Sequence, residues 1–274
     1  MPELDTPRRP RAMTIAGSDS GGGAGIQADL KTFQALGVYG TSAISAITAQ
    51  NTLGVRAVHE VPTRLIADQI DAVAEDIGVD AAKTGMLSSA DIIATVADRI
   101  RHWRIERLVV DPVMVAKSGD RLLREDAVQA LVRELLPLAL VLTPNLPEAE
   151  VLVGRPLASE EDIRRAARDI VGMGARSVVM KGGHREGDAV DVLFDGHDFH
   201  TFISERIDTP NTHGTGCTFS AAIVAGLAEG QNVVEAVGMA KRYVTEAIRH
   251  AWPLGGGHGP VAHDWLLGRA ALRA

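Results

Sequence analysis

Short apolar runs alternate with longer amphipathic stretches along most of this 274-residue chain. The apolar runs predict strands that are buried on both faces, and the amphipathic stretches predict the helices that cover them. The pattern is typical of an α/β fold with a mostly parallel sheet. We expect strands at 13–16, 42–48, 81–84, 108–110, 140–142 and 178–180, and helices at 26–36, 63–76, 90–101, 125–136, 161–173, 218–229 and 233–250.

The stretch 190–203 departs from this alternation. Two short β-like runs flank Asp195 and Gly196, and an Asp-Gly pair is a strong hairpin signal. We therefore expect a small antiparallel edge on the sheet.

Residues 1–11 are polar and lack an apolar core, so they predict a disordered lead-in and not a signal peptide. The remainder, 12–274, is expected to fold as a single domain.

Composition limits the partners and the compartment. The formal net charge is −7, with 28 basic and 35 acidic residues and no long basic run, so we expect no nucleic-acid partner. The single cysteine cannot form an internal disulfide, which favours a reducing, cytoplasmic location. The longest apolar run, 135–142, is too short to span a bilayer, and we expect no membrane partner.

A small-residue loop, 212–217, contains Gly214, Thr215, Gly216 and the only cysteine, Cys217, and it runs into a predicted helix. Glycines let backbone N–H groups converge, and the free N–H groups of a first helical turn add partial positive charge. Such a loop can bind the anion that develops in phosphoryl transfer. The alternative is an ordinary loop-to-helix junction with a buried cysteine.

Ligands of open parallel sheets bind beyond the carboxyl ends of the strands, so the residues that follow each strand are of most interest. The glycine-rich loop 17–25 follows the first strand, and its spacing fits a dinucleotide-binding fingerprint poorly. Asp29, in the next helix, is either a first-turn charge or a ligand contact. Gln50 follows the second strand, and its carboxamide matches the edge of an aminopyrimidine; the alternative is a residue that caps a turn.

Polar residues also follow the later strands. Asp111 and Glu148 could supply the one or two carboxylates that Mg²⁺ takes in phosphoryl-transfer sites. Alternatively, Asn145 caps a helix whose first turn contains Glu148. Lys181 either meets a nucleotide phosphate or is a solvated charge. The P-loop sequence and the protein-kinase motifs are both missing from the chain, which excludes those two ATP-using classes.

Taken together and in this order, the motifs closely resemble those of the hydroxymethylpyrimidine and hydroxymethylpyrimidine-phosphate kinases of thiamine biosynthesis, in the ribokinase-like superfamily. The resemblance covers nearly the whole chain, from about Met13 to Val261. It rests on segments 16–19, 22–32, 49–52, 83–87, 116–120, 143–148, 180–184 and 213–217.

The resemblance implies a ribokinase-like three-layer α/β/α sandwich and a homodimer. It also implies two successive phosphorylations, dependent on ATP and Mg²⁺, of 4-amino-5-hydroxymethyl-2-methylpyrimidine to its monophosphate and then to its diphosphate. The matching motif positions assign the site residues. The pyrimidine would contact Gln50, Asp29, Gly17, Met86 and Val113; ATP would contact Thr143, Asn145 and Lys181; the metal would bind Glu148 and Asp111; and Gly214, Thr215, Gly216 and Cys217 would form the anion hole.

Cys217 stands where much of the superfamily has the aspartate that takes a proton from the attacking hydroxyl. An unperturbed thiol has a pKa of about 8.5, and we expect the helix N-terminus to lower the pKa of Cys217 so that a thiolate can act as the base. The stretch 115–121 is expected to close over the substrate, because water in the site would compete as acceptor.

Two other functions remain open at this point. Relatives with much the same scaffold phosphorylate pyridoxal, and Gln50 favours the aminopyrimidine over that ring. A non-catalytic pyrimidine-binding protein could keep the fold, since fold does not determine function. Against that second reading stands the presence of every candidate residue: Asp111, Asn145, Glu148, Lys181 and Cys217.

Overall fold

The computed structural model describes residues 8–114, 125–183 and 187–267. The strands of these residues form one nine-stranded sheet in the order β3-β2-β1-β4-β5-β6-β7-β8-β9. Pairing is parallel from β2 through β1 to β7 and antiparallel at β2–β3, β7–β8 and β8–β9. The strands are β1 (Arg11–Asp19), β2 (Tyr39–Asn51), β3 (Gly54–Glu60), β4 (Ala81–Thr84), β5 (Leu108–Val110), β6 (Val141–Leu142), β7 (Val178–Met180), β8 (Ala189–Phe194) and β9 (Phe199–Ser204).

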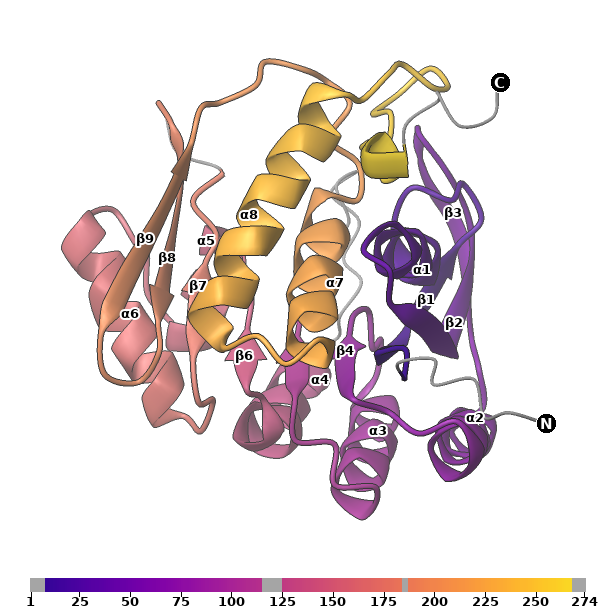
Figure 1. Ribbon diagram of the computed structural model, residues 1–274. Helices are drawn as coiled ribbons and strands as arrows, with labels where there is room; N and C mark the ends of the chain where they lie inside the picture. The colour runs from indigo at the N-terminus through magenta and orange to yellow at the C-terminus, as the bar shows by residue number, and fades with distance from the viewer. Residues whose placement is uncertain (1–7, 115–124, 184–186, 268–274) are drawn as a thin grey trace.

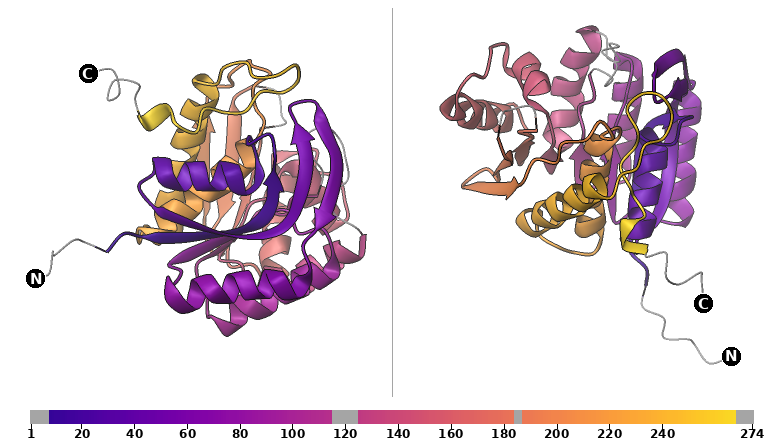
Figure 2. Two further views of the ribbon diagram at one scale, coloured as in Figure 1. Left: turned by 90° about the vertical axis from the view of Figure 1, so that its right-hand side faces the viewer. Right: turned by 90° about the horizontal axis from the view of Figure 1, so that it is seen from above.

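Helices cover both faces of the sheet, which makes three layers (Figure 1). Helices α1, α7 and α8 lie on one face, and α2 to α6 lie on the other, as the edge-on view of Figure 2 (left) shows for α1 and α2. The helices are α1 (Gly25–Ala35), α2 (Thr63–Asp76), α3 (Ala90–His102), α4 (Glu125–Ala130), η1 (Leu131–Leu135), η2 (Leu136–Leu138), α5 (Leu146–Val153), α6 (Glu160–Gly172), α7 (Thr215–Ala228), α8 (Val233–Arg249) and η3 (Trp265–Leu267).

The two-residue period of a strand divides the core into two halves. In β5, Leu108 and Val110 belong to the cluster under α2 to α6, whereas Val109 belongs to the cluster under α1, α7 and α8. In β7, Val179 likewise lies on the face that α7 covers, and Val178 and Met180 lie on the opposite face. Strands buried on both faces therefore appear in the sequence as unbroken apolar runs.

The expected α/β fold is confirmed, with one difference at an end of the sheet. The hairpin around Asp195 and Gly196 joins β8 to β9, as predicted, but a second antiparallel pair, β2–β3, forms the opposite edge. Most side chains of β3 are exposed, so its sequence lacks the apolar run by which the other strands were found. Helix α5 was also missed, and the predicted helix 125–136 consists of α4 followed by a π-helical turn, η1.

The described residues at the end of the predicted lead-in 1–11 contact the folded domain. Arg11 begins β1, and its guanidinium is 2.8 Å from Asp80 Oδ1, which also pairs with Arg8. The predicted mobile stretch 115–121 lies outside the described residues. Within the described ranges, no helix is both long and apolar enough to cross a membrane.

Candidate active site

The glycine loop of residues 212–217 begins α7 in the predicted way. Gly214 is the N-cap, with a left-handed φ of 80°, and Thr218 N–H donates to its carbonyl at 2.8 Å. A Cβ on Gly214 would lie 1.8 Å from Gly23 O, so only glycine fits there. The amides of Gly216 and Cys217 fall in the first turn, where a helix has no internal acceptor for them. This end of α7 therefore carries partial positive charge.

The thiol of Cys217 is partly exposed at this helix start. Desolvation by the surrounding protein raises the pKa of Cys217 to about 11; Lys83 opposes this rise, while the carboxylates of Asp29 and Asp111 add to it. The Gly25 amide donates toward the sulfur and also lowers the pKa. The expectation that the helix N-terminus would give an acidic thiol is thus wrong for this structure, because burial outweighs the donors.

Asp111 and Lys181 form an ion pair against the first turns of α7. Lys181 Nζ lies 3.1 Å from Asp111 Oδ1, and Ser220 of α7 donates to Oδ2 at 3.1 Å. A side chain on Gly216 would come within 3.5 Å of Lys181 Nζ, which places this cation over the start of the helix. Burial opposes charge on Lys181, but Asp111 and Glu148 raise the pKa of Lys181. Lys181 is thus a charged group at the glycine loop of residues 212–217.

Thr143 lies beside Asp111 in the interior. Its side chain is fully buried, and its hydroxyl lies 3.3 Å from Asp111 Oδ1. The side chain therefore supports Asp111, and its expected contact with a nucleotide stays a prediction.

Asn145 and Glu148 adopt the capping arrangement that the sequence left open. Asn145 Oδ1 accepts from Glu148 N–H at 2.8 Å, and Glu148 Oε2 accepts from Asn145 N–H at 2.8 Å, which begins α5. Asn145 also forms a β-bridge with Lys181. Burial raises the pKa of Glu148. The positive charge of Lys181 lowers this pKa and the negative charge of Asp111 raises it, so the three groups interact electrostatically.

The two carboxylates near Lys181 suit a magnesium ion of the kind that binds beside phosphates, where the protein supplies only one or two ligands. Asp111 and Glu148 provide two carboxylates around Lys181. No group of three or more His, Cys, Asp or Glu side chains that could hold a metal occurs in the described ranges. An ion here would complete its coordination with water and phosphate oxygens.

Asp29 lies in the interior. Its side chain has no exposed surface; Oδ1 accepts from Lys83 Nζ at 2.7 Å and Oδ2 from Thr14 Oγ1 at 2.6 Å. Burial opposes charge on Lys83, but Asp29 holds the pKa of Lys83 above its ordinary value. Both oxygens of Asp29 have partners inside the protein, and the expected contact between Asp29 and a pyrimidine stays a prediction. The pair lies behind Cys217, and its effect on the thiol is electrostatic.

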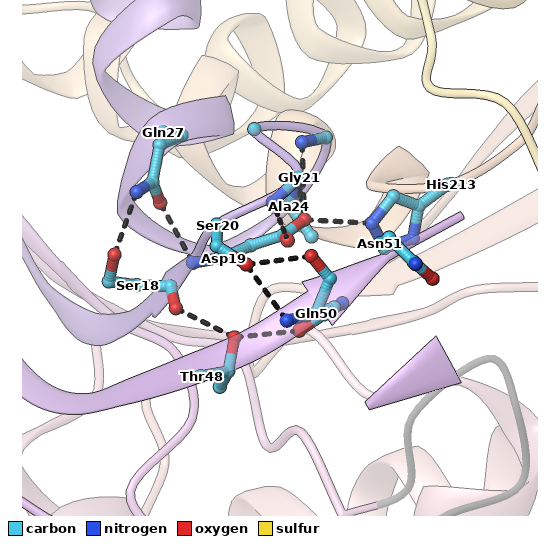
Figure 3. A network of polar contacts seen from close by, with 12 residues as sticks. Ser18, Asp19, Ser20, Gly21, Ala24, Gln27, Thr48, Gln50, Asn51 and His213 are labelled. Carbon is cyan, nitrogen blue, oxygen red and sulfur yellow. Dashed lines mark hydrogen bonds and ion pairs between the residues drawn. The ribbon is translucent and has the colours of Figure 1, made fainter. Parts of the chain in front are cut away.

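The other expected pyrimidine contacts lie at the ends of β1, β2, β4 and β5. Gly17 and Met86 come together, because a Cβ on Gly17 would meet Met86 Cε at 2.5 Å. Gln50 is partly buried, and its Oε1 accepts from Thr48 Oγ1 at 3.1 Å, which orients the carboxamide (Figure 3). Val113 follows Asp111 and is partly exposed. Gly17 and Met86 are thus brought together by the fold.

Sequence reasoning assigned no role to Asp19 or His213, which form a contact of 2.9 Å in Figure 3. Burial alone would raise the pKa of Asp19, but the hydrogen bonds from His213 and from the Ala24 and Gly21 amides hold it below its ordinary value. Asp19 and His213 belong to segments 16–19 and 213–217, two of those on which the resemblance to the pyrimidine kinases rests. Their shared contact was hidden because 194 positions separate them.

Known proteins share these motifs over most of the chain. The sequence model of the family described as phosphomethylpyrimidine kinase matches residues 19–262. The hydroxymethylpyrimidine/phosphomethylpyrimidine kinase of Rhizobium meliloti is 56% identical over 92% of this chain and 96% of its own length. The thiamine biosynthesis bifunctional protein ThiED of Geobacter sulfurreducens is also 56% identical, over 93% of this chain, which spans about half, 52%, of that protein.

Solved structures extend the likeness to the fold. The Bacillus subtilis pyridoxal kinase, solved as an ADP complex, superposes with a TM-score of 0.88 at 45% identity. The superposition covers 95% of this chain and 99% of that one.

Proposed function

Because the chain belongs to the phosphomethylpyrimidine kinase family, we propose that it phosphorylates 4-amino-5-hydroxymethyl-2-methylpyrimidine to the monophosphate and then to the diphosphate in thiamine biosynthesis. It is a kinase, as its relatives are named, and ATP is the phosphate donor. The observation that carries the proposal is the start of α7, where backbone amides, Lys181 and the thiol of Cys217 converge beside the strand ends.

Phosphoryl transfer requires stabilisation of negative charge and alignment of two substrates, and it needs little covalent help from the protein. The amides of Gly216 and Cys217 would hold the transferring group, and Lys181 would neutralise its charge. Cys217 would accept the proton of the substrate hydroxyl in the first step through its thiolate form, which a pKa of about 11 makes a small fraction of the protein at neutral pH. In the second step the attacking oxygen belongs to a phosphate that is already ionised, so little base assistance is needed.

We assign the magnesium ion to Asp111 and Glu148, with Asn145 beside them at the phosphates. When bound, Mg²⁺ would screen the charge of the ATP phosphates. In this structure Lys181 pairs with Asp111, the Asp111 carboxylate also accepts from Ser220, and the Glu148 carboxylate accepts from Asn145 N–H. Gln50, Gly17, Met86 and Val113 would bind the pyrimidine ring.

The decisive experiment counts phosphates by mass spectrometry after purified protein, Mg-ATP and the hydroxymethylpyrimidine react. Two phosphates on the pyrimidine support the proposal, and none would refute it. Asp195→Asn, on the distant β8–β9 hairpin, is the matched control for Asp111→Asn. We expect the control to retain both steps and Asp111→Asn to lose both.

Pyridoxal phosphorylation is the second candidate, since the Bacillus subtilis structure named a pyridoxal kinase superposes over 95% of this chain. The same assay with pyridoxal tests it. One phosphate on pyridoxal and none on the pyrimidine would assign the chain to vitamin B6 salvage.

The exposed apolar side chains of the β2–β3 edge support a homodimer. Ile47, Leu53 and Val58 are 53%, 67% and 46% exposed on this hairpin. A second copy of the chain would cover them, as large exposed apolar groups at a sheet edge favour association. Light scattering after gel filtration should give twice the chain mass, and Ile47→Glu should give the chain mass. A monomeric wild-type protein would refute this part.

We further propose a cytoplasmic, small-molecule enzyme whose residues 12–274 fold as one domain. The single cysteine supports a reducing compartment, and the net charge of −7 supports a partner other than nucleic acid. The continuous sheet from β3 to β9 supports one domain. Limited proteolysis should leave one resistant fragment, and two separable fragments would contradict the single domain.

A further inference from the structure

The loop that follows β1 is wound around one carboxylate. Asp19 Oδ1 accepts from Gly21 N–H at 2.8 Å, and Oδ2 accepts from the N–H groups of Gly23 and Ala24 at 3.1 and 2.8 Å. Asp19 is only 3% exposed, so water competes little for these hydrogen bonds. Its side chain points into its own loop in Figure 3.

The same carboxylate also contacts the loop before α7. His213 Nε2 lies 2.9 Å from Asp19 Oδ2, and an ionised carboxylate has no proton to give, so Nε2 is the donor. The backbone of His213 is fixed independently, because its N–H donates to Gly259 O at 3.0 Å and its carbonyl accepts from Val261 N–H at 3.2 Å. The ring also fills the space beside Gly23, where a Cβ would meet His213 Cδ2 at 2.4 Å.

These contacts join the two halves of the active site. The α7 side contributes the anion hole, and the β1 side contributes the pyrimidine pocket through Gly17. Thr48 Oγ1 lies 2.9 Å from the Ser18 carbonyl oxygen and 3.1 Å from Gln50 Oε1, so its single proton is shared between these two acceptors. The Gly25 amide, at the other end of the loop, faces the Cys217 sulfur. A shift of the loop would therefore move both halves.

We propose that Asp19 and His213 form a clamp that fixes the distance between the pyrimidine pocket and the anion hole. They are positioning residues, which act through the loop 17–25 and the start of α7 and touch neither substrate. The inference rests on the proposed kinase function. Its consequence is that the clamp controls the rate of phosphoryl transfer more than the binding of ATP.

The kinetic test compares two substitutions at one position. In His213→Leu the clamp is lost, and kcat for pyrimidine phosphorylation should fall about 100-fold, the loss that a misplacement of about 1 Å can cause, with KM for ATP unchanged. In His213→Gln a side-chain N–H can still reach Asp19, and kcat should recover most of that loss. Asp19→Asn should match His213→Leu, and the double variant should lose no more than either single one.

A second contact between a histidine and an aspartate provides the matched control. His200 Nε2 lies 2.9 Å from Asp195 Oδ2 on the β8–β9 hairpin, the same separation as in the clamp. His200→Leu and Asp195→Asn should leave kcat within about twofold of the wild type, since these residues couple to no part of the site.

A readout independent of turnover separates this inference from the proposed function. Hydrogen exchange should show lost amide protection in residues 17–25 of His213→Leu, with residues 190–203 unchanged. If wild-type protein phosphorylates no pyrimidine, the proposed function fails, and exchange alone then decides on the clamp. Wild-type kcat in His213→Leu, no recovery in His213→Gln, or unchanged protection of 17–25 would each overturn the clamp.

Discussion

The acidity of Cys217 can be measured directly, because it is the only cysteine of the chain and is partly exposed. Alkylation by iodoacetamide requires the thiolate, so its rate follows the ionised fraction. Burial raises the pKa of Cys217 to about 11, and the thiol should remain protonated through neutral pH.

The size of the effect follows from that pKa. At pH 8 a thiol of pKa about 11 is about 0.1% ionised, whereas an unperturbed thiol with a pKa of about 8.5 is about 24% ionised. The native rate should therefore increase about tenfold per pH unit from pH 7 to 9.5 without a plateau. A thiolate of higher pKa is intrinsically more reactive, so the shape of the profile is the measure and the absolute rate is not.

The control is the same protein in urea, where the rate of Cys217 alkylation should level off near pH 8.5 to 9. Mass spectrometry of the modified chain gives both profiles. A native plateau at or below pH 8 would refute the reasoning, since the amides of α7 and Lys83 would then outweigh burial.

The remaining predictions concern the two phosphorylation steps, the start of α7 and the buried pair of Asp29 and Lys83. Cys217→Ala should slow the first phosphorylation more than the second, because only the first needs a base; equal losses, measured by chromatography of both products, would assign Cys217 a packing role. Gly37→Ala, at a φ of 79° with open space, should cost about 1 kcal/mol of unfolding free energy, whereas Gly214→Ala, at a φ of 80° with a Cβ 1.8 Å from a backbone oxygen, should cost more and abolish turnover. Asp29→Asn leaves the buried Lys83 without its counter-charge and should lower the unfolding free energy by about 3–5 kcal/mol in urea titrations; an unchanged midpoint would contradict the ion pair.

The presence of the central strands could be expected from the sequence, because strands buried on both faces require unbroken apolar runs. The edge strand β3 could not, since its side chains are mostly exposed and lack that signal. Helix α5 is eight residues long, which is too short to show a clear helical period.

The parts of the candidate site that depend on backbone conformation could be predicted from the sequence. Gly214 needs a positive φ, and the motif around it predicted a helix start that the structure contains. The roles of polar side chains on α1 and after the strands were harder to predict, since the sequence does not tell which of them point inward. Asp29 and Thr143 are both fully buried, and only their partners in the fold, Lys83 and Asp111, explain why a polar group is tolerated there.

The position of α7 late in the chain has a consequence for biosynthesis. From Thr218 to Ala228 every residue of α7 is buried, and the helix packs on β1, β4 and β5, which are translated long before it. A ribosome that has not yet released residue 228 holds a nascent chain whose early strands have one apolar face open to solvent. We expect this intermediate to be the one that chaperones bind, and the kinase to mature only when its own anion-binding helix arrives.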